Sequence, residues 1–326
     1  MTQFILTGGT QRQKLLGGIP EWAMYEKAVC AVLDTESGAL KQTLAYESPT
    51  GVRPEPGCHI FKSGSVHASH LWVVTQTEVL KIGLPSFDID AVYSLYSYND
   101  LHHVCFIDGD MHVVSTGLDC VVQHDGIGEP KKWHHALGKD IVSCFDLNKD
   151  WRQAATTKPH ASHPNFCFNT AHGLWMTRFK QKDAVCVAEP DRRIPIDVGN
   201  PHDGLVHDTS VWFTTTNGHL VQSDPETCVV EHVYDMNQAS KDGAPLGWCR
   251  GLHIEGRIAY VGFSRIRKTK IHKNLAWIKH GFRLPEGYQH RETRVAAYDL
   301  DSRQFIREWD VEPAGLSTIF SILPWS

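Results

Sequence analysis

A pattern of short strands recurs along this chain at intervals of about 40 to 60 residues. Each copy has a first strand that begins with polar side chains, a turn, a β-rich second strand and an outer hairpin. The copies begin near Cys58, Leu101, Ser162, Pro201 and Gly247. Those at Leu101 and Gly247 align without a gap, and a repeat of this length is typical of β-propeller blades.

The two ends of the chain supply the missing parts of one more copy. Residues 316–322 form a first strand with no second strand after it, and residues 4–7 form a second strand with no first strand before it. Pairing the two would close a ring and remove an open sheet edge. We therefore predict an all-β, six-bladed β-propeller that occupies residues 1–326 as a single domain. The alternative is a pair of β-sandwiches.

Residues 264–294 depart from the repeat and interrupt the last blade. Three apolar side chains there have helical spacing, and Gly281 provides a stop: Ile271, Leu275 and Ile278. We expect a short basic helical insertion. Its first cations, Arg265, Arg267 and Lys268, would bind a small anionic molecule through charge-assisted contacts. The alternative is a solvated helix face.

Composition narrows the class of protein. The chain has 326 residues, a formal net charge of -5, and nine cysteines without CxxC spacing. These features argue against nucleic acid as a partner, a disulfide framework and a zinc ribbon. Neither a signal peptide nor an apolar run of about 18 residues is recognisable, so we expect a cytoplasmic protein that does not enter membranes. Nothing in the sequence fixes the oligomeric state.

Histidine is the unusual component, with 20 copies in the chain. His102, His163 and His202 stand at the heads of aligned first strands, and His59 occupies a less secure position in another copy. In a propeller these strands line the central channel, so their heads converge near one mouth. Imidazoles in a ring suit a divalent transition metal such as Zn, Fe, Mn or Cu. The alternative is that the histidines are polar neighbours of channel water.

The residues that follow these strand heads are candidate catalytic groups. They are His103, Asp203 and Arg250. Asp203 would serve as a general base or would orient a metal-bound histidine.

The strand head His202-Asp203-Gly204-Leu205 and the strand end Tyr298-Asp299-Leu300-Asp301 resemble those of six-bladed β-propellers. That broad group holds the NHL, strictosidine-synthase-like and gluconolactonase-like proteins, and the chain also looks like uncharacterised bacterial propellers with strand-head histidines. Gluconolactonase-like members hold a divalent metal through Glu and Asn on channel strands. Here Asn165 is the one clear match, and histidines stand where the other oxygens would be. The resemblance therefore favours a softer metal than calcium.

Together these features predict a metal-dependent enzyme that acts on a small anionic substrate at the mouth of the channel. Hydrolase, lyase and oxygenase chemistry remain open. The alternative function is a non-catalytic propeller scaffold that binds a protein or carbohydrate partner. Such a scaffold would present an apolar or aromatic patch on one rim, for which Trp133, Trp151 and Trp277 are candidates.

Overall fold

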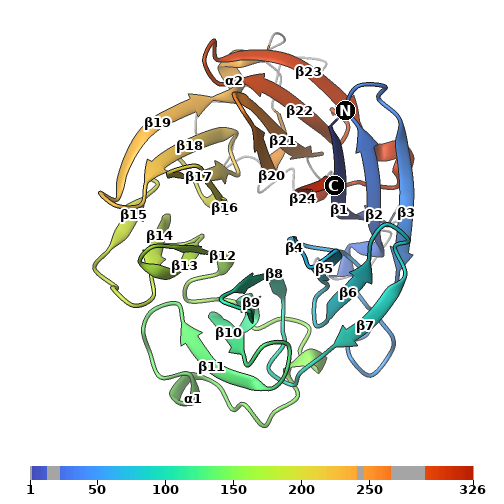
Figure 1. Cartoon of the computed structure of the whole chain (residues 1–326). Helices are drawn as coiled ribbons and strands as arrows, with labels where there is room; N and C mark the ends of the chain where they lie inside the picture. The colour runs from blue at the N-terminus through green and yellow to red at the C-terminus, as the bar shows by residue number, and fades with distance from the viewer. Residues whose placement is uncertain (1, 13–22, 241–245, 266–290, 326) are drawn as a thin grey trace.

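The computed structural model describes residues 2–12, 23–240, 246–265 and 291–325. Six four-stranded antiparallel sheets are arranged as blades around a central channel (Figure 1). This confirms the predicted six-bladed β-propeller and excludes the pair of sandwiches. The helix predicted between Ile271 and Ile278 lies outside the described residues. Within the described ranges, no helix is both long and apolar enough to cross a membrane.

Each blade runs from an inner strand at the channel to an outer strand at the rim. The blade that holds both chain ends contains β24 (Ile319–Trp325), β1 (Gln3–Gln11), β2 (Tyr25–Asp34) and β3 (Leu40–Tyr46). The second contains β4 (Gly64–His67), β5 (His70–Val74), β6 (Val79–Gly83) and β7 (Ile89–Tyr93). The third contains β8 (Leu101–Ile107), β9 (Asp110–Ser115), β10 (Cys120–His124) and β11 (Pro130–His135).

The remaining three blades follow in chain order. The fourth contains β12 (Pro164–Thr170), β13 (Gly173–Arg178), β14 (Asp183–Cys186) and β15 (Arg193–Pro195). The fifth contains β16 (Pro201–His207), β17 (Ser210–Thr215), β18 (His219–Asp224) and β19 (Val229–Asp235). The sixth contains β20 (Trp248–Glu255), β21 (Ile258–Ser264), β22 (Arg294–Asp299) and β23 (Gln304–Asp310). Two one-turn helices, α1 (Ile141–Cys144) and α2 (Met236–Ala239), lie in the connections after β11 and β19.

The ring is closed by pairing of the two chain ends, as predicted. β24 and β1 are antiparallel neighbours, with Leu6 opposite Ile322, and the register shifts between Thr7 and Gly8. A Cβ at Gly8 would lie 1.9 Å from the carbonyl oxygen of Thr318. Only glycine therefore permits the close approach of backbones that joins the first and last strands.

The hydrophobic core is divided among the six seams between neighbouring blades. Each seam has its own cluster of buried apolar side chains. The seam beside the chain ends, for example, packs Phe4 and Leu33 of the first blade against Val295 and Trp309 of the sixth. Each such side chain contributes about 1.5 to 3 kcal/mol on burial. Because every blade is held on both flanks, the heads of the inner strands have fixed positions around the channel.

Candidate functional site

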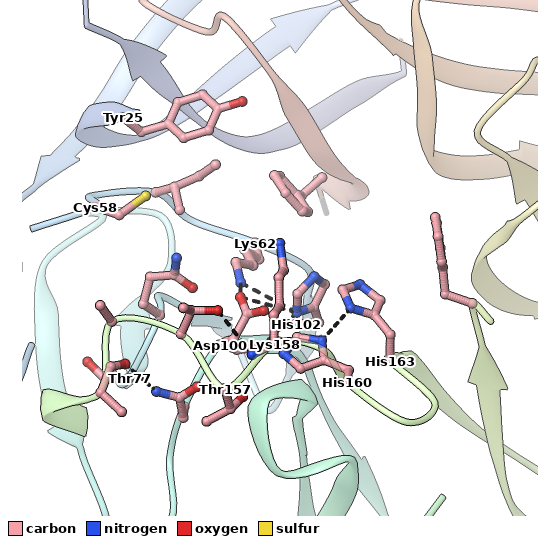
Figure 2. Close-up of a pocket in the computed structure, with 18 of the residues that line it drawn as sticks. Tyr25, Cys58, Lys62, Thr77, Asp100, His102, Thr157, Lys158, His160 and His163 are labelled. Carbon is pink, nitrogen blue, oxygen red and sulfur yellow. Dashed lines mark hydrogen bonds and ion pairs between the residues drawn. The ribbon is translucent and has the colours of Figure 1, made fainter. Parts of the chain in front are cut away.

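A cavity of about 840 Å³ opens where the inner strands begin (Figure 2). All six blades contribute to its wall. Each blade contributes a lining residue at or near the start of its inner strand. In chain order these residues are Lys62, His102, His163, His202, Arg250 and Phe320. The convergence of strand heads predicted from the repeat is therefore present.

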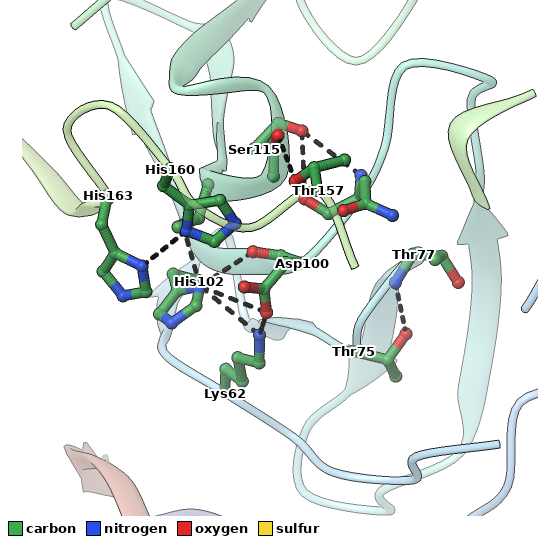
Figure 3. Close-up of polar contacts among 12 residues, drawn as sticks. Lys62, Thr75, Thr77, Asp100, His102, Ser115, Thr157, His160 and His163 are labelled. Carbon is green, nitrogen blue, oxygen red and sulfur yellow. Dashed lines mark hydrogen bonds and ion pairs between the residues drawn. The ribbon is translucent and has the colours of Figure 1, made fainter. Parts of the chain in front are cut away.

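Lys62 and Asp100 form an ion pair in the cavity wall, next to His102 (Figure 3). The Nδ1 atom of His102 lies 2.8 Å from the backbone oxygen of Asp100 and 2.8 Å from the Thr116 hydroxyl oxygen. The Lys62 Nζ atom is 3.4 Å from the same nitrogen. These neighbours occupy Nδ1, so Nε2 is the atom through which His102 can act on a ligand.

His160 and His163 face one another through their Nδ1 atoms, which are 2.8 Å apart. A carboxylate oxygen of Asp100 lies within 4.8 Å of ligand atoms of both histidines. Two nitrogens bound to one metal at about 2.1 Å each are separated by about 3.0 to 3.4 Å. The observed pair therefore needs to move by only a few tenths of an ångström to chelate a metal. The other ring nitrogen of His160 is buried without a hydrogen-bond partner among the described residues.

The three histidines predicted to converge do lie together. The ring centroid of His102 is 5.0 Å from that of His163 and 6.4 Å from that of His202. The His202 ring packs edge-on against Phe179 and makes no hydrogen bond within the described part of the chain. Burial lowers the pKa of His102 and His202 well below the usual range and that of His163 to about 3. All three are therefore neutral at pH 7, the form that binds metals.

His59 does not join this group. Its Nδ1 atom accepts a hydrogen bond of 3.0 Å from the backbone N–H of Ser48. The residues on either side of it, Cys58 and Ile60, line the cavity, whereas His59 does not. The structure thus corrects the predicted alignment of this blade: Lys62, three residues later, occupies the position facing His102.

The strand register also corrects the alignment of His163 with His102. Leu101 and Pro164 each pair with the last residue of the following strand. The residues just before them, Asp100 and His163, both have left-handed backbone conformations, with φ of 50° and 61°. His163 therefore corresponds to Asp100. Asn165 is the true equivalent of His102, and its side chain donates a hydrogen bond to the Pro201 carbonyl instead.

Of the three predicted catalytic residues, only Arg250 reaches the cavity, where its guanidinium stacks 4.2 Å from the centre of the Phe320 ring. The Asp203 carboxylate lies behind the wall and accepts hydrogen bonds from the Thr214 hydroxyl and the Gly251 N–H. Burial raises the pKa of Asp203 to about 6. His103 stacks on Phe166 and does not line the cavity. Asp203 and His103 therefore do not line the cavity at the channel mouth.

The predicted substrate-binding residues lie elsewhere or outside the described ranges. Arg265 forms an ion pair of 3.2 Å with Glu312 and donates a hydrogen bond to the Ser317 hydroxyl. It does not line the cavity. Arg267 and Lys268 lie outside the described residues.

Other cations line the cavity. Lys158 and Lys180 join Lys62 and Arg250 in its wall, and Arg53 is paired with Glu55 at 2.7 Å. Asp100 is the one carboxylate among the described lining residues. The cavity therefore carries an excess of positive charge. The sequence signal for this region was the close grouping of Lys158, His160 and His163 ahead of a strand, but repeat alignment treats that segment as a loop.

No family model matches the chain, and no curated protein sequence matches it. Solved structures are similar in fold. A protein of unknown function from Bacteroides caccae has a TM-score of 0.62 and 11% identity, with 99% of each chain covered. A chain of a nidogen/laminin complex has a TM-score of 0.55 and 9% identity, covering 99% of this chain and 98% of that one.

A third structure, apo AztD from Citrobacter koseri, has a TM-score of 0.47 and 11% identity, covering 99% of this chain and 98% of that one. At these identities the likeness concerns fold and says nothing of the reaction. The chain has the fold of the six-bladed β-propeller group that its sequence resembles.

Proposed function

We propose that the chain is a metal-dependent enzyme that holds a divalent transition metal at the channel mouth and acts on a small anionic molecule. The observation that carries this proposal is the facing pair of Nδ1 atoms in His160 and His163, with the Asp100 carboxylate within 4.8 Å. Two imidazoles and a carboxylate are a donor set suited to Zn, Fe and Mn.

Asp100 can take part in metal binding while it remains paired with Lys62. The ion pair uses its Oδ1 atom, and an ionised carboxylate has a second oxygen with free lone pairs. When bound, the metal would polarise a substrate oxygen or activate a water molecule. That donor set fits hydrolase, lyase and oxygenase chemistry alike.

The remaining wall supports binding of an anion. Lys158, Lys180 and Arg250 come from different parts of the chain and line the same cavity. Ammonium and guanidinium groups form charge-assisted hydrogen bonds with carboxylates and phosphates. A volume of about 840 Å³ is that of a small-molecule site.

We assign His202 the role of a neutral hydrogen-bonding group that contacts the substrate. Its ring lines the cavity, with its centroid 6.4 Å from that of His102, and makes no hydrogen bond with another described residue. Burial lowers its pKa, with Arg250 and His163 adding to the effect, so the ring stays neutral and offers one donor and one acceptor nitrogen.

Metal analysis of the purified full-length chain tests the proposal. We expect about one equivalent of Zn, Fe or Mn per chain, and a rise in the unfolding temperature when that metal is added after EDTA treatment. The His163→Ala variant should lose both the bound metal and the rise in unfolding temperature when metal is added. His172→Ala is the matched control, because His172 makes its contacts with Glu226 and Glu189 on the surface.

The opposite result would favour the scaffold alternative. A folded wild-type chain that binds none of these metals and whose unfolding temperature is indifferent to them overturns the enzyme proposal. The same follows if His163→Ala and His172→Ala retain metal equally.

A further inference from the structure

A second group of metal-capable side chains lies in the seam between the third and fourth blades. His103 and Cys105 project from β8, and Cys167 faces them from β12. Their ligand atoms all lie within 4.8 Å of one another. None of the three lines the cavity at the channel mouth. The group is therefore separate from the site described above, and it contains two sulfur atoms.

The distances in this group match those of a zinc site. The two Sγ atoms are 3.5 Å apart, and Cys167 Sγ is 3.6 Å from His103 Nδ1. On a tetrahedral zinc with Zn–S and Zn–N bonds of about 2.3 and 2.1 Å, two sulfurs are about 3.8 Å apart. A sulfur and a nitrogen on the same zinc are about 3.6 Å apart. Two of the three edges of a ligand triangle are thus already close to their bound lengths.

The orientation of His103 supports ligation through Nδ1. Its ring lies nearly parallel to Phe166, with centroids 3.6 Å apart, which fixes the ring plane. The ring also has a backbone hydrogen bond at Gly64. A ring that donates from one nitrogen and presents the other to a metal is the usual arrangement of metal-bound histidine. The Cys167 N–H, 3.4 Å from Nδ1, makes only a long contact with that lone pair.

The charge of the three ligands favours a divalent metal ion. On binding, each thiol releases its proton to solvent and forms a bond from sulfur to the metal, with no change in oxidation state. Two thiolates and a neutral imidazole around a divalent ion form a neutral group, which avoids the cost of burying a net charge. Thiolate ligands also select thiophilic metals over Mg²⁺ or Ca²⁺.

We propose that His103, Cys105 and Cys167 form a second metal site, specific for Zn²⁺, that joins β8 of the third blade to β12 of the fourth. Three protein ligands leave one coordination position for a small ligand. Cys105 is the partly exposed member of the group, so the metal reaches the site from that side. Binding there stabilises the seam between the two blades, because the ligands come from both.

Cobalt substitution tests this site in the full-length chain. Co²⁺ added to the EDTA-treated protein should give a sulfur-to-cobalt charge-transfer band in the near ultraviolet, and added Zn²⁺ should remove it. Cys105→Ser and Cys167→Ser should each weaken cobalt binding by more than about tenfold. Cys144→Ser, at an exposed position, and Cys58→Ser, in the cavity wall, should keep the band.

The test separates this site from the one at the channel mouth. His163→Ala should keep the charge-transfer band even if it loses other metal, since His163 lies outside the cysteine group. Circular dichroism of each variant shows whether it is folded, and Cys105→Ser, at the partly exposed position, is the variant best placed to remain so. The proposal is overturned if wild type gives no band, if the band survives in Cys105→Ser, or if mass spectrometry shows that Cys105 and Cys167 form a disulfide.

Discussion

Lys62 and Asp100 form an ion pair that joins the second and third blades at the channel mouth. Their side chains are 5% and 24% exposed. Burial would raise the pKa of the Asp100 carboxyl, but the charge and the hydrogen bond of the Lys62 ammonium act in the opposite direction and the net effect lowers the pKa, so the group is ionised. The same carboxylate is the acidic member of the proposed metal site. The Lys62 ammonium therefore already neutralises part of the Asp100 negative charge that a bound metal would otherwise neutralise.

Lys62→Met should reveal this competition. Loss of the ammonium leaves a largely buried carboxylate without its counter-ion, which should lower the free energy of unfolding by about 3 kcal/mol in metal-free protein. A divalent metal at His160 and His163 then becomes the counter-ion for Asp100. We expect the loss of stability to be smaller when Zn²⁺ is present, and metal affinity to rise. Chemical denaturation with and without metal measures both.

Lys131→Met is the control for that experiment. Lys131 pairs with Asp110 at 3.2 Å, but its side chain is 55% exposed. Exposed pairs contribute about 0 to 1 kcal/mol, so this variant should change little and should not respond to metal. Equal stability loss in the two variants, or a Lys62→Met variant that binds metal no better than wild type, would contradict the prediction.

The ring and its closure could be predicted from the sequence because strand period, repeat length and the two half-blades all indicate the same architecture. The direction in which each side chain at a strand head points, toward the channel or away from it, could not be predicted. The registers of β8 and β16 shift between Leu101 and His103 and between His202 and Leu205. An extra residue at such a bulge changes which side chains face the channel. His103 and Asp203 follow His102 and His202 directly, yet they lie behind the wall.

Two members of the site were missed for a different reason. His160 lies in the loop before β12, and its position depends on backbone contacts that no repeat encodes, such as Asp119 accepting hydrogen bonds from Ala161 and Ser162. Lys62 lies ahead of β4, where a long connection obscures the repeat. In both cases the sequence carries the residue type, but only the tertiary contacts fix its place.

Gly8→Ala should open the ring. The added Cβ would meet the backbone oxygen of Thr318 at 1.9 Å, so β24 would have to move away from β1. We expect a loss of several kcal/mol of stability, about the size of a severe packing error, and faster amide hydrogen exchange in 319–325. Gly83→Ala is the control, because its added Cβ meets only the exposed Asp90 carboxylate, at 3.1 Å. Equal hydrogen exchange in the two variants would mean that the closure tolerates the Cβ.

Acid should destabilise the propeller through its buried neutral histidines. Burial lowers the pKa of His134 to about 4, with Lys132 and His112 adding to the effect. An unfolded histidine has a pKa of about 6.5, so between pH 6.5 and 4 the unfolded chain binds a proton that the folded chain does not. The free energy of unfolding must therefore fall as pH decreases through this window.

His134→Gln should flatten that dependence. The free energy of unfolding of the variant, minus that of wild type, should be larger at pH 5 than at pH 7. His232→Gln, at an exposed position on β19, is the control. Denaturant titrations at the two pH values measure the difference. A pH dependence in His134→Gln that equals that of the control would show that His134 does not contribute.

The buried ion pair between Arg178, at the end of β13, and Asp183 should contribute to the free energy of unfolding and should leave metal binding unaffected. Arg178 donates to both oxygens of Asp183 and, at 2.9 Å, to the carbonyl of Ala136 in the connection after the neighbouring blade. The side chains are only 6% and 10% exposed. Arg178→Met would leave the Asp183 carboxylate buried without a counter-ion, which costs about 3 to 5 kcal/mol.

The double variant Arg178→Met/Asp183→Asn should recover part of that loss, because the second substitution removes the uncompensated charge. Arg178 immediately precedes Phe179 and Lys180, which line the cavity. We therefore expect weaker binding of a small anion such as phosphate in Arg178→Met and partial restoration in the double variant, with the metal content unchanged in both. If the double variant were no more stable than Arg178→Met, the cost would come from the lost Arg178 contacts, including Ala136, and not from the buried carboxylate.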